Sequence, residues 1–356
     1  MNIGILGLPQ SGKSVVFGAV AAGQEAQAHD PSKPRMATVK VPDDRMEYLR
    51  EMFKPKKYTL DSIEFLDFAG LFDTSPEAPR DSRVFAAVRD CDALMIVLRG
   101  FASDTVPHPK GTIDPARDLS FIESEMLLAD LDMIERRIER LEVDVKKPRP
   151  TQKQELLELD VLKRCRDTIN EEKPIKSLQL KSDEAKAIRG FRFLSEKDAV
   201  MVVNIADDQA ASDQWRQALE AKYREVLFVK GRIEAEIAEL DENDRAEFMA
   251  EMGLAESARD RLIRSAFRAL GRGNFFTVGE DEVRAWPLEL DASAVDAAGT
   301  IHTDLARGFI RAEVVHFDDL KACGSMRDVK AQNKLHLEGK EYKVKDGDIL
   351  NIRFSV

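Results

Sequence analysis

Cysteine is scarce in this chain, and the few cysteines are widely separated. The 356 residues include only Cys91, Cys165 and Cys323, with no C-x-x-C pair. A disulfide-rich secreted domain and a cysteine-ligated zinc site both need more cysteines at closer spacing, so neither is expected. The sequence predicts free thiols in a reducing compartment.

Long apolar runs are also missing. No stretch approaches the roughly 20 apolar residues of a membrane helix, which predicts a protein without a membrane span. The chain passes from Met1 directly into a short apolar segment, so we expect no signal or transit peptide and a cytoplasmic location. The net charge of −11 argues against whole-surface capture of nucleic acid, and sequence-specific DNA binding is not expected.

Residues 7–14 fit the pattern G-x-x-x-x-G-K-[ST] and follow the apolar run of residues 3–6. A strand, a glycine-rich turn and a helix are the context in which this pattern cradles phosphate. Backbone N–H groups and the helix N-terminus face the anion there. We predict a nucleoside triphosphate site in which Lys13 pairs with the β and γ phosphates and the Ser14 hydroxyl coordinates Mg²⁺. The candidate contacts are Gly7, Gln10, Ser11, Gly12, Lys13, Ser14 and Val15.

Short apolar runs alternate with helical patterns along the chain. The runs are residues 62–67, 93–98, 200–204 and 226–229, and the candidate helices are residues 14–22, 44–53 and 82–89. Continuous apolar character is typical of strands buried on both faces of a mostly parallel sheet. The sequence therefore predicts an α/β protein with a three-layer P-loop NTPase domain, a G domain.

The tetrapeptide of residues 67–70 fits the D-x-x-G element of GTPase-like proteins. Asp67 is a candidate for the Mg²⁺ shell, and the Gly70 N–H for sensing the γ-phosphate. The next residue is Leu71, where Ras-like enzymes have a glutamine that orients the attacking water. Because leucine cannot hydrogen-bond to water, we expect slow hydrolysis with water positioned by another group.

Residues 204–207 resemble the guanine-reading N-K-x-D element, with Ile205 replacing the lysine. A carboxylate at Asp207 would accept hydrogen bonds from guanine N1–H and N2–H₂ but would face the N1 lone pair of adenine. The alternative is a turn that caps the following helix. Asn204, Ile205, Asp207 and Lys230 are the candidate nucleotide-binding residues of this part of the chain.

A highly charged stretch interrupts the apolar runs. Leu127, Leu131, Ile134, Ile138, Leu141 and Val145 recur at spacings of four and three, the seam of a coiled coil. Residues 146–150 read Lys-Lys-Pro-Arg-Pro and break the helix, and a second helix at about 152–170 returns antiparallel. The prediction is a helical-hairpin insert with a basic tip, extended by Lys153, that is a candidate contact for RNA or another acidic partner.

We predict three domains: a G domain from residues 1–116 and 197–273, the hairpin insert from 117–196, and a small domain from 274–356. In the last of these, β-prone segments alternate with turns, among them Glu338-Gly339-Lys340 and Asp346-Gly347-Asp348. This pattern indicates hairpins in a mixed domain of about 80 residues.

These motifs, the insert and the C-terminal stretch together resemble the YchF family of Obg-related ATPases, from the first strand to the end of the chain. The similarity is strongest in residues 232–240, 274–286, 298–304, 307–314 and 346–354. The resemblance implies a C-terminal TGS domain with a ubiquitin-like β-grasp. It also implies a cytosolic, ribosome-associated protein that hydrolyses ATP slowly in preference to GTP, and Leu71 matches the hydrophobic residue of that family.

The chain also departs from the family pattern. Gln10 replaces an asparagine that is a plausible cation ligand, which leaves potassium stimulation open. Residues 30–35 contain no threonine for Mg²⁺, and Ser32 is the nearest hydroxyl; residues 72–80 contain two prolines and no glycine. Asp207 replaces a glutamate. We place ATP ahead of GTP; the alternatives are a GTPase of the same architecture and a non-hydrolysing RNA- or ribosome-binding module.

Overall fold

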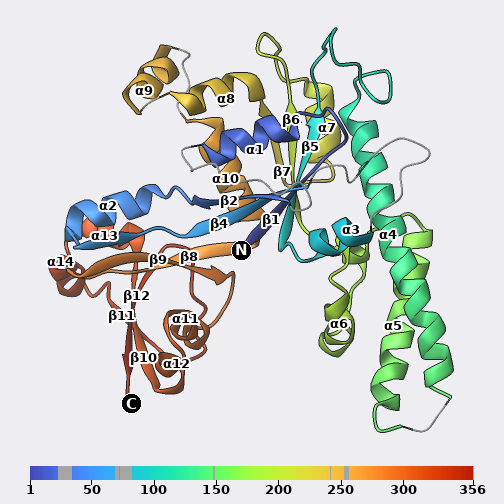
Figure 1. Ribbon diagram of the computed structural model, residues 1–356. Helices are drawn as coiled ribbons and strands as arrows, with labels where there is room; N and C mark the ends of the chain where they lie inside the picture. Colours follow the sequence, from blue (N-terminus) through green and yellow to red (C-terminus); the bar gives the residue numbers. More distant parts are fainter. Residues whose placement is uncertain are drawn as a thin grey trace. The chain divides into compact units, whose positions relative to one another are not determined.

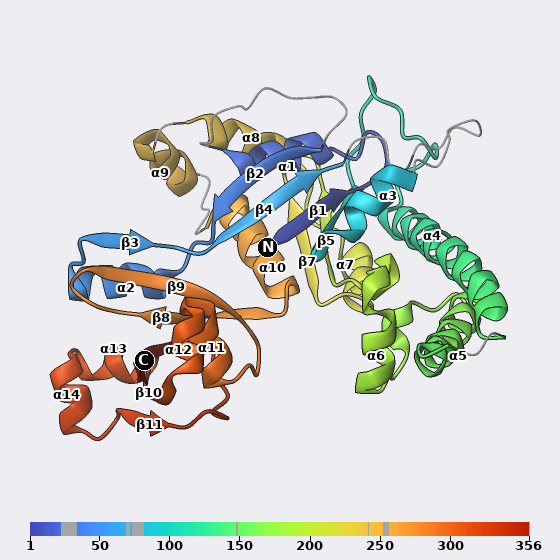
Figure 2. The same ribbon diagram turned by 60° about the horizontal axis from the view of Figure 1, so that its bottom comes forward.

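The computed structural model describes residues 1–22, 34–68, 72, 82–146, 149–240, 242–251 and 256–355. Its internal contacts divide the chain into two compact units. The first consists of Met1–Ala37 and Glu64–Arg259, and the second of Thr38–Ile63 and Asp260–Val356. Figures 1 and 2 show the elements of both from two directions.

A six-stranded sheet in the order β2-β4-β1-β5-β6-β7 carries the nucleotide motifs. Neighbouring strands from β4 to β7 are parallel. All seven residues of β5 are buried, which explains its unbroken apolar sequence. The predicted strands are confirmed, whereas β2, in which buried and exposed residues alternate, was not predicted. The strands are β1 (Asn2–Leu6), β2 (Arg35–Lys40), β4 (Ser62–Asp67), β5 (Ala93–Arg99), β6 (Ala199–Asn204) and β7 (Glu225–Val229).

Helices cover both faces of this sheet, as the three-layer prediction requires (Figure 1). Buried side chains of α3, α4 and α7 share one apolar cluster with alternate residues of β5 and β6. Helices α1 and α8 contact each other. The bounds of these helices are α1 (Lys13–Ala21), α3 (Ser82–Arg89), α7 (Asp213–Glu220) and α8 (Gly231–Glu239). Two helices follow along the chain, α9 (Glu242–Glu251) and α10 (Ala258–Ala269), and most of α10 belongs to the second unit.

The insert is a helical hairpin of α4 (Pro115–Asp144) and α5 (Gln152–Asn170). Helix α4 begins earlier than the coiled-coil seam, because Asp114 caps its first turn by accepting a hydrogen bond from the Arg117 N–H. The six predicted seam residues pack in one cluster, which confirms a self-packed seam. The chain returns through η1 (Ile175–Ser177), α6 (Ser182–Ile188), η2 (Arg189–Phe191) and η3 (Leu194–Glu196).

The second unit contains a sheet in the order β11-β10-β12-β8-β9-β3. Strands β8 and β12 lie next to each other in the middle of the sheet and are parallel. On its other side, β8 pairs antiparallel with β9, and β12 pairs antiparallel with β10. With α11 following the first hairpin, this is the predicted β-grasp. The elements are β8 (Arg272–Thr277), β9 (Glu282–Glu289), α11 (Ala294–Ile301), α12 (Thr303–Arg307), β10 (Phe309–His316), α13 (Phe317–Cys323), α14 (Met326–Ala331), β11 (His336–Glu338) and β12 (Asp348–Phe354).

An N-terminal segment belongs to the same unit. Strand β3 (Lys57–Thr59) pairs in parallel with β9, and α2 (Asp44–Phe53) buries Met46 and Leu49 against Phe276 and Leu320. The contact units therefore group residues 38–63 with the C-terminal part, while the predicted three-domain boundaries remain predictions. Among the described helices, none is long and apolar enough to cross a membrane.

Asp61 lies in this unit, and its buried carboxyl should make the stability of the protein depend on pH. Burial raises the pKa of its carboxyl to about 6, although the hydrogen bond that it accepts from the Ser62 N–H acts in the opposite direction. Its Oδ2 has no hydrogen-bond partner in the described part of the chain. Because the folded pKa exceeds the unfolded value of about 3.9, the free energy of unfolding should rise as pH falls from about 6 to 4. We expect Asp61→Asn to raise the melting temperature at pH 7 and to flatten the pH profile in that window. The exposed Asp291→Asn is the control, and an unchanged profile in Asp61→Asn would contradict the prediction.

Candidate functional site

The loop between β1 and α1 has the backbone of an anion cradle. Gly7 (φ 156°), Gln10 (φ 63°) and Gly12 (φ 88°) all have positive φ. A Cβ on Gly7 would lie 2.3 Å from the Val97 carbonyl oxygen, so the close approach of the loop to β5 requires glycine. Helix α1 has no side-chain cap, and its first N–H groups are therefore available to a phosphate.

Lys13 is folded along its own loop. Its ammonium donates a hydrogen bond to the Gly7 carbonyl at 2.7 Å. Burial lowers the pKa of Lys13, and the nearby Asp67 carboxylate opposes this shift. Ser14 and Val15 follow it on the exposed side of the first turn. The predicted phosphate-binding residues thus lie around one helix N-terminus.

Asp67 ends β4 within electrostatic range of Lys13 and is almost fully buried. Its Oδ2 accepts hydrogen bonds from the Arg35 guanidinium, and its Oδ1 has no hydrogen-bond partner in the described structure. The Arg35 guanidinium also lies over the Phe17 ring, 4.9 Å from the centroid. An unpartnered carboxylate oxygen and a hydroxyl are hard donors that suit Mg²⁺, so Asp67 and Ser14 fit the predicted metal shell. Gly70 and Leu71 lie outside the described residues, and their roles stay predictions.

We expect the Arg35 guanidinium and Mg²⁺ to compete for the Asp67 carboxylate. The guanidinium and Mg²⁺ would occupy the same carboxylate, so removing the cation should ease metal entry. We expect Arg35→Ala to lower, by several-fold, the Mg²⁺ concentration that gives half-maximal ATP binding. Calorimetric ATP titrations at a series of Mg²⁺ concentrations measure this, with Arg35→Lys as the control that keeps a cation. An unchanged Mg²⁺ requirement in Arg35→Ala would refute the competition.

A pocket of about 720 Å³ opens beside the loop. This volume falls in the range of ligand sites of about 300–1,000 Å³ and accommodates a nucleoside. Its walls come from the N-terminus of α1, the chain after β5, the chain after β6 and the first turns of α8. The lining residues are Gly12, Val15, Phe101, Ala102, Ser103, Asn204, Ile205, Ala206, Asp207, Asp208, Arg232, Ala235 and Glu236.

Asn204 connects two walls of this pocket. Its Nδ2 donates to the Ser11 carbonyl at 3.3 Å, and its Oδ1 accepts from the Gly231 N–H at 3.1 Å. Both polar atoms therefore have partners within the protein. The Ile205 side chain is buried in the wall. Lys230 precedes α8 and is not among the lining residues.

Asp207 lies at the edge of the pocket. Its Oδ1 is buried without a hydrogen-bond partner among the described residues, and its Oδ2 lies 3.9 Å from Arg232 Nε. A second carboxylate, Glu236, is closer to the same nitrogen at 3.3 Å. The Asp207 carboxylate is thus placed to accept a hydrogen bond from a ligand, although the base that it would read remains a prediction.

The pocket wall after β5 was not predicted from the sequence. Arg99, which is 2% exposed, shapes this wall: its Nε donates to the Phe101 carbonyl at 3.1 Å and its Nη2 to the Val106 carbonyl at 2.6 Å. The same segment continues to His108, whose ring pairs with Asp118 in the first turn of α4 at 2.8 Å. This wall could have been predicted, because β5 ends at the same edge of the sheet as β1 and β6. Arg35, Arg232 and Glu236 were missed as well.

Comparisons with known proteins agree along the whole chain. The family model YchF-GTPase_C, described as a protein of unknown function (DUF933), matches residues 273–355. The ribosome-binding ATPase YchF of Bacillus subtilis (strain 168) is 36% identical over 368 residues, with 100% of both chains covered. That of Escherichia coli O157:H7 is 37% identical with 99% of both covered. The Obg-like ATPase 1 of Oryza sativa subsp. japonica is 34% identical, with 100% of this chain and 92% of that protein covered.

A solved structure supports the same conclusion. The Schizosaccharomyces pombe YchF GTPase superposes with a TM-score of 0.84 at 27% identity, covering 99% of this chain and 97% of that one. Phosphate-loop geometry, a hairpin insert, a β-grasp and full-length similarity above 30% identity coincide in one protein. The chain belongs to the YchF family of P-loop NTPases.

Proposed function

We propose that the protein is a cytoplasmic, Mg²⁺-dependent ATPase that hydrolyses slowly and acts as a nucleotide-controlled regulator on the ribosome. The observation that carries the proposal is the Gly7–Ser14 cradle with Lys13 inside it, opening onto a nucleoside-sized pocket. Relatives named ribosome-binding ATPases cover the whole chain and support the same assignment.

In this proposal the chain's own groups bind and orient the triphosphate. Lys13 exchanges the Gly7 carbonyl for phosphate oxygens, and the N–H groups at the start of α1 donate to the same anion. Mg²⁺, held by Ser14 and Asp67, would neutralise charge on the phosphates. Leu71 supplies no hydrogen bond to the attacking water, so turnover is expected to be slow until another group or a partner positions that water.

The choice between ATP and GTP is tested at Asp207. Calorimetric titration of nucleotide-free protein with each nucleotide and Mg²⁺ should give tighter ATP binding, and Asp207→Ala should change ATP affinity little. If Asp207 instead reads guanine, GTP should bind more tightly, and Asp207→Ala should weaken GTP about tenfold or more through lost charge-assisted hydrogen bonds. That second result would favour the runner-up, a GTPase of the same architecture.

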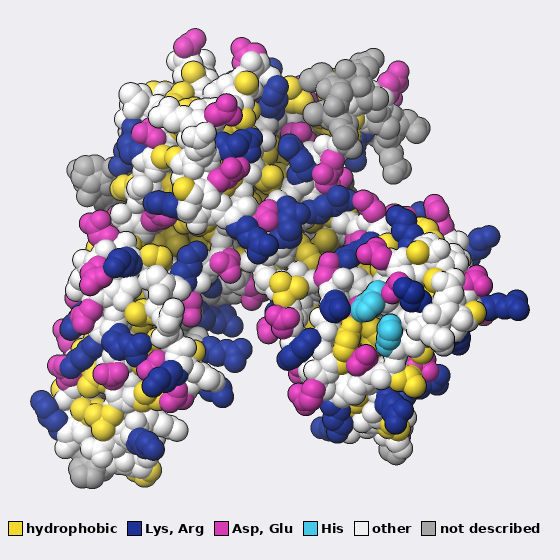
Figure 3. Space-filling model, turned by 180° about the vertical axis from the view of Figure 1, so that it is seen from behind, with side chains coloured by type: hydrophobic (Ala, Val, Ile, Leu, Met, Phe, Trp, Pro, Cys, Tyr) yellow, Lys and Arg dark blue, Asp and Glu magenta, His cyan; other side chains and the backbone are white. Residues whose placement is uncertain are grey.

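Turnover separates the ATPase from a non-hydrolysing binding module. Phosphate release above that of a Lys13→Ala control supports the enzyme, whereas ATP binding without release supports the module. The ribosome part is tested by co-sedimentation with ribosomes in the presence and absence of ATP. Because acidic and basic side chains are interspersed on the face in Figure 3 and the net charge is −11, we expect contact through local patches of the hairpin and TGS domains rather than one basic surface.

A further inference from the structure

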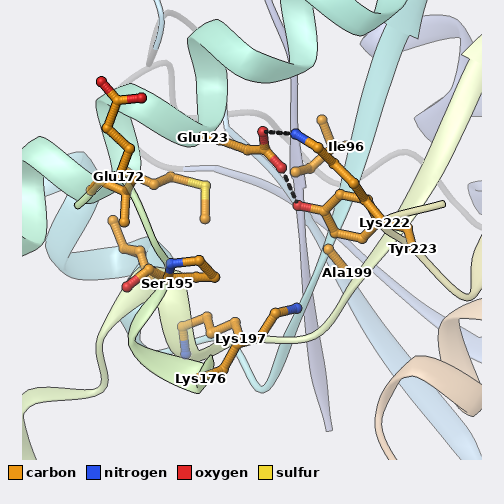
Figure 4. A pocket seen from close by; sticks show the side chains of 13 residues that line it. Ile96, Glu123, Glu172, Lys176, Ser195, Lys197, Ala199, Lys222 and Tyr223 are labelled. Atoms are coloured by element: carbon orange, nitrogen blue, oxygen red, sulfur yellow. Dashed lines mark hydrogen bonds and ion pairs between the residues drawn. The ribbon is translucent and has the colours of Figure 1, made fainter. Parts of the chain in front are cut away.

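A second pocket lies at the root of the insert and shares no lining residue with the nucleotide pocket. Its volume is about 330 Å³, the lower end of the range for small-molecule sites. Both ends of the insert contribute walls, through α4 on one side and η1 and η3 on the other, and the sheet supplies the floor (Figure 4). The lining residues are Ile96, Glu123, Met126, Leu127, Glu172, Pro174, Lys176, Leu194, Ser195, Lys197, Ala199, Lys222 and Tyr223.

The interior of this pocket is apolar with one aromatic wall. Ile96 and Leu194 are fully buried behind the wall, and the half-buried Leu127, Pro174 and Ala199 give the pocket its apolar lining. The Tyr223 hydroxyl donates to Glu123 Oε1 at 2.9 Å, which fixes the ring at the edge of the cavity. A flat apolar group would find dispersion contacts on several sides and a ring to pack against. At this volume the apolar body would be about two or three rings in size.

The charges at the rim favour an anionic end on that body. Glu123 is already paired with Lys222 at 3.1 Å, and in Figure 4 the Glu172 carboxylate points away from the middle of the pocket. Lys176 lies over the Tyr223 ring, 5.4 Å from its centroid, and within the described part of the chain it pairs with Asp198 at 4.0 Å, the limit of an ion pair. An ammonium has three donors, so Lys176 keeps capacity for a ligand.

Lys197 also favours an anionic group on the ligand. It is half-buried, burial lowers its pKa, and no carboxylate lies within ion-pair distance of it among the residues that the structure describes. Its ammonium donates to the Cys91 carbonyl instead. A partly desolvated cation with no close ion pair among the described residues is stabilised by an approaching anion. Two lysines thus flank an apolar cavity in which Glu123 is already paired and the Glu172 carboxylate points away from the middle (Figure 4).

We propose that this pocket binds a small aromatic anion, with its rings between Met126, Leu127 and Tyr223 and its acidic group at Lys176. Because α4 and the returning η1 and η3 segments both line the site, an occupant would stiffen the root of the insert and raise the melting temperature. The proposal is independent of the ATPase assignment, since the two pockets share no residue.

Fluorescence titration of the full chain with anilinonaphthalene sulfonate, an aromatic sulfonate, tests the proposal. We expect one saturable site that ATP does not displace and that persists in Lys13→Ala. Lys176→Gln should weaken binding about tenfold, the effect of one charge-assisted hydrogen bond, and Ala199→Phe should remove the site by filling it. Lys173→Gln is the matched control, because this lysine of the same loop pairs with Glu171 and does not line the pocket. The neutral analogue N-phenylnaphthylamine should not respond to Lys176→Gln.

Chemical labelling of lysines tests the same proposal on the unmodified sequence, without a mutation. Acetylation of Lys176, followed by peptide mass spectrometry, should slow in the presence of the sulfonate, while acetylation of Lys173 should not change. Binding that is non-saturable, or that survives both Lys176→Gln and Ala199→Phe unchanged with no protection of Lys176, would overturn the proposal. Loss of ATP binding in Lys13→Ala with retained sulfonate binding would keep the two sites distinct.

Discussion

Lys13→Ala should reduce ATP affinity by about 100-fold or more. The substitution leaves phosphate charge uncompensated in a partly buried site, where truncation of one member of a charged pair costs about 2–5 kcal/mol or more. In the nucleotide-free protein the same lysine is buried against the Gly7 carbonyl with a lowered pKa, so its removal should not lower the melting temperature. The expected signature is lost ligand binding with retained stability.

Two further variants separate charge from volume at this position. Lys13→Met keeps most of the apolar stem and should lose ATP affinity as Lys13→Ala does, whereas Lys13→Arg keeps the charge and should lose less. Calorimetry gives the affinity, and thermal unfolding with and without ATP gives the stability; the ATP-induced rise in melting temperature should disappear in the alanine and methionine variants. Full ATP affinity in Lys13→Met would show that the residue does not contact phosphate.

Gly12→Ala should have an effect of similar size for a steric reason. Gly12 has φ 88°, and a Cβ there would lie 2.1 Å from Asn204 Nδ2, which donates a hydrogen bond to the Ser11 carbonyl of the loop. Left-handed strain of about 1–3 kcal/mol adds to the clash. The loop or Asn204 must move, and both line the nucleotide pocket. We expect ATP affinity to fall by about 100-fold, measured by calorimetry.

Gly18→Ala is the matched control for that substitution. Gly18 lies six residues further along, within α1, and a Cβ there meets nothing within 4 Å. Alanine in a helix interior is favoured over glycine by about 1 kcal/mol, so this variant should be more stable and bind ATP normally. If Gly12→Ala also bound ATP normally, the close packing of the loop on Asn204 would not matter for the site.

The conformation of the loop between β1 and α1 was predictable from the sequence, because the loop pattern specifies a local conformation. The strand, the glycine-rich turn and the helix that place Lys13 are adjacent in the sequence. The buried strands were predictable for a related reason, since continuous apolar runs such as β5 are typical of a sheet covered on both faces. The helical hairpin followed from its heptad spacing and the prolines at its tip.

The other features of the fold and the site depend on contacts between residues that no local sequence pattern indicates. Nothing near Arg35 in the sequence indicates that its guanidinium pairs with Asp67, 32 residues away. Helix α2 was predicted as a helix, but its packing on Phe276 joins residues more than 200 positions apart. The Arg99 contacts are local in sequence, yet a buried arginine that shapes a loop looks like any strand-ending arginine until its carbonyl partners are known.

The segment held by Arg99 and His108 has a mechanical consequence. It is a short covalent path from the wall of the nucleotide pocket to the first turn of α4, and hydrogen bonds hold it at both ends. Helix α4 has 30 residues and is therefore about 45 Å long. A pivot of about 5° at its first turn would carry the far end through about 4 Å. Any tilt of α4 would therefore be largest at the far end of the hairpin, whereas Leu119, Ile122 and Met126 keep its first turns packed on the sheet.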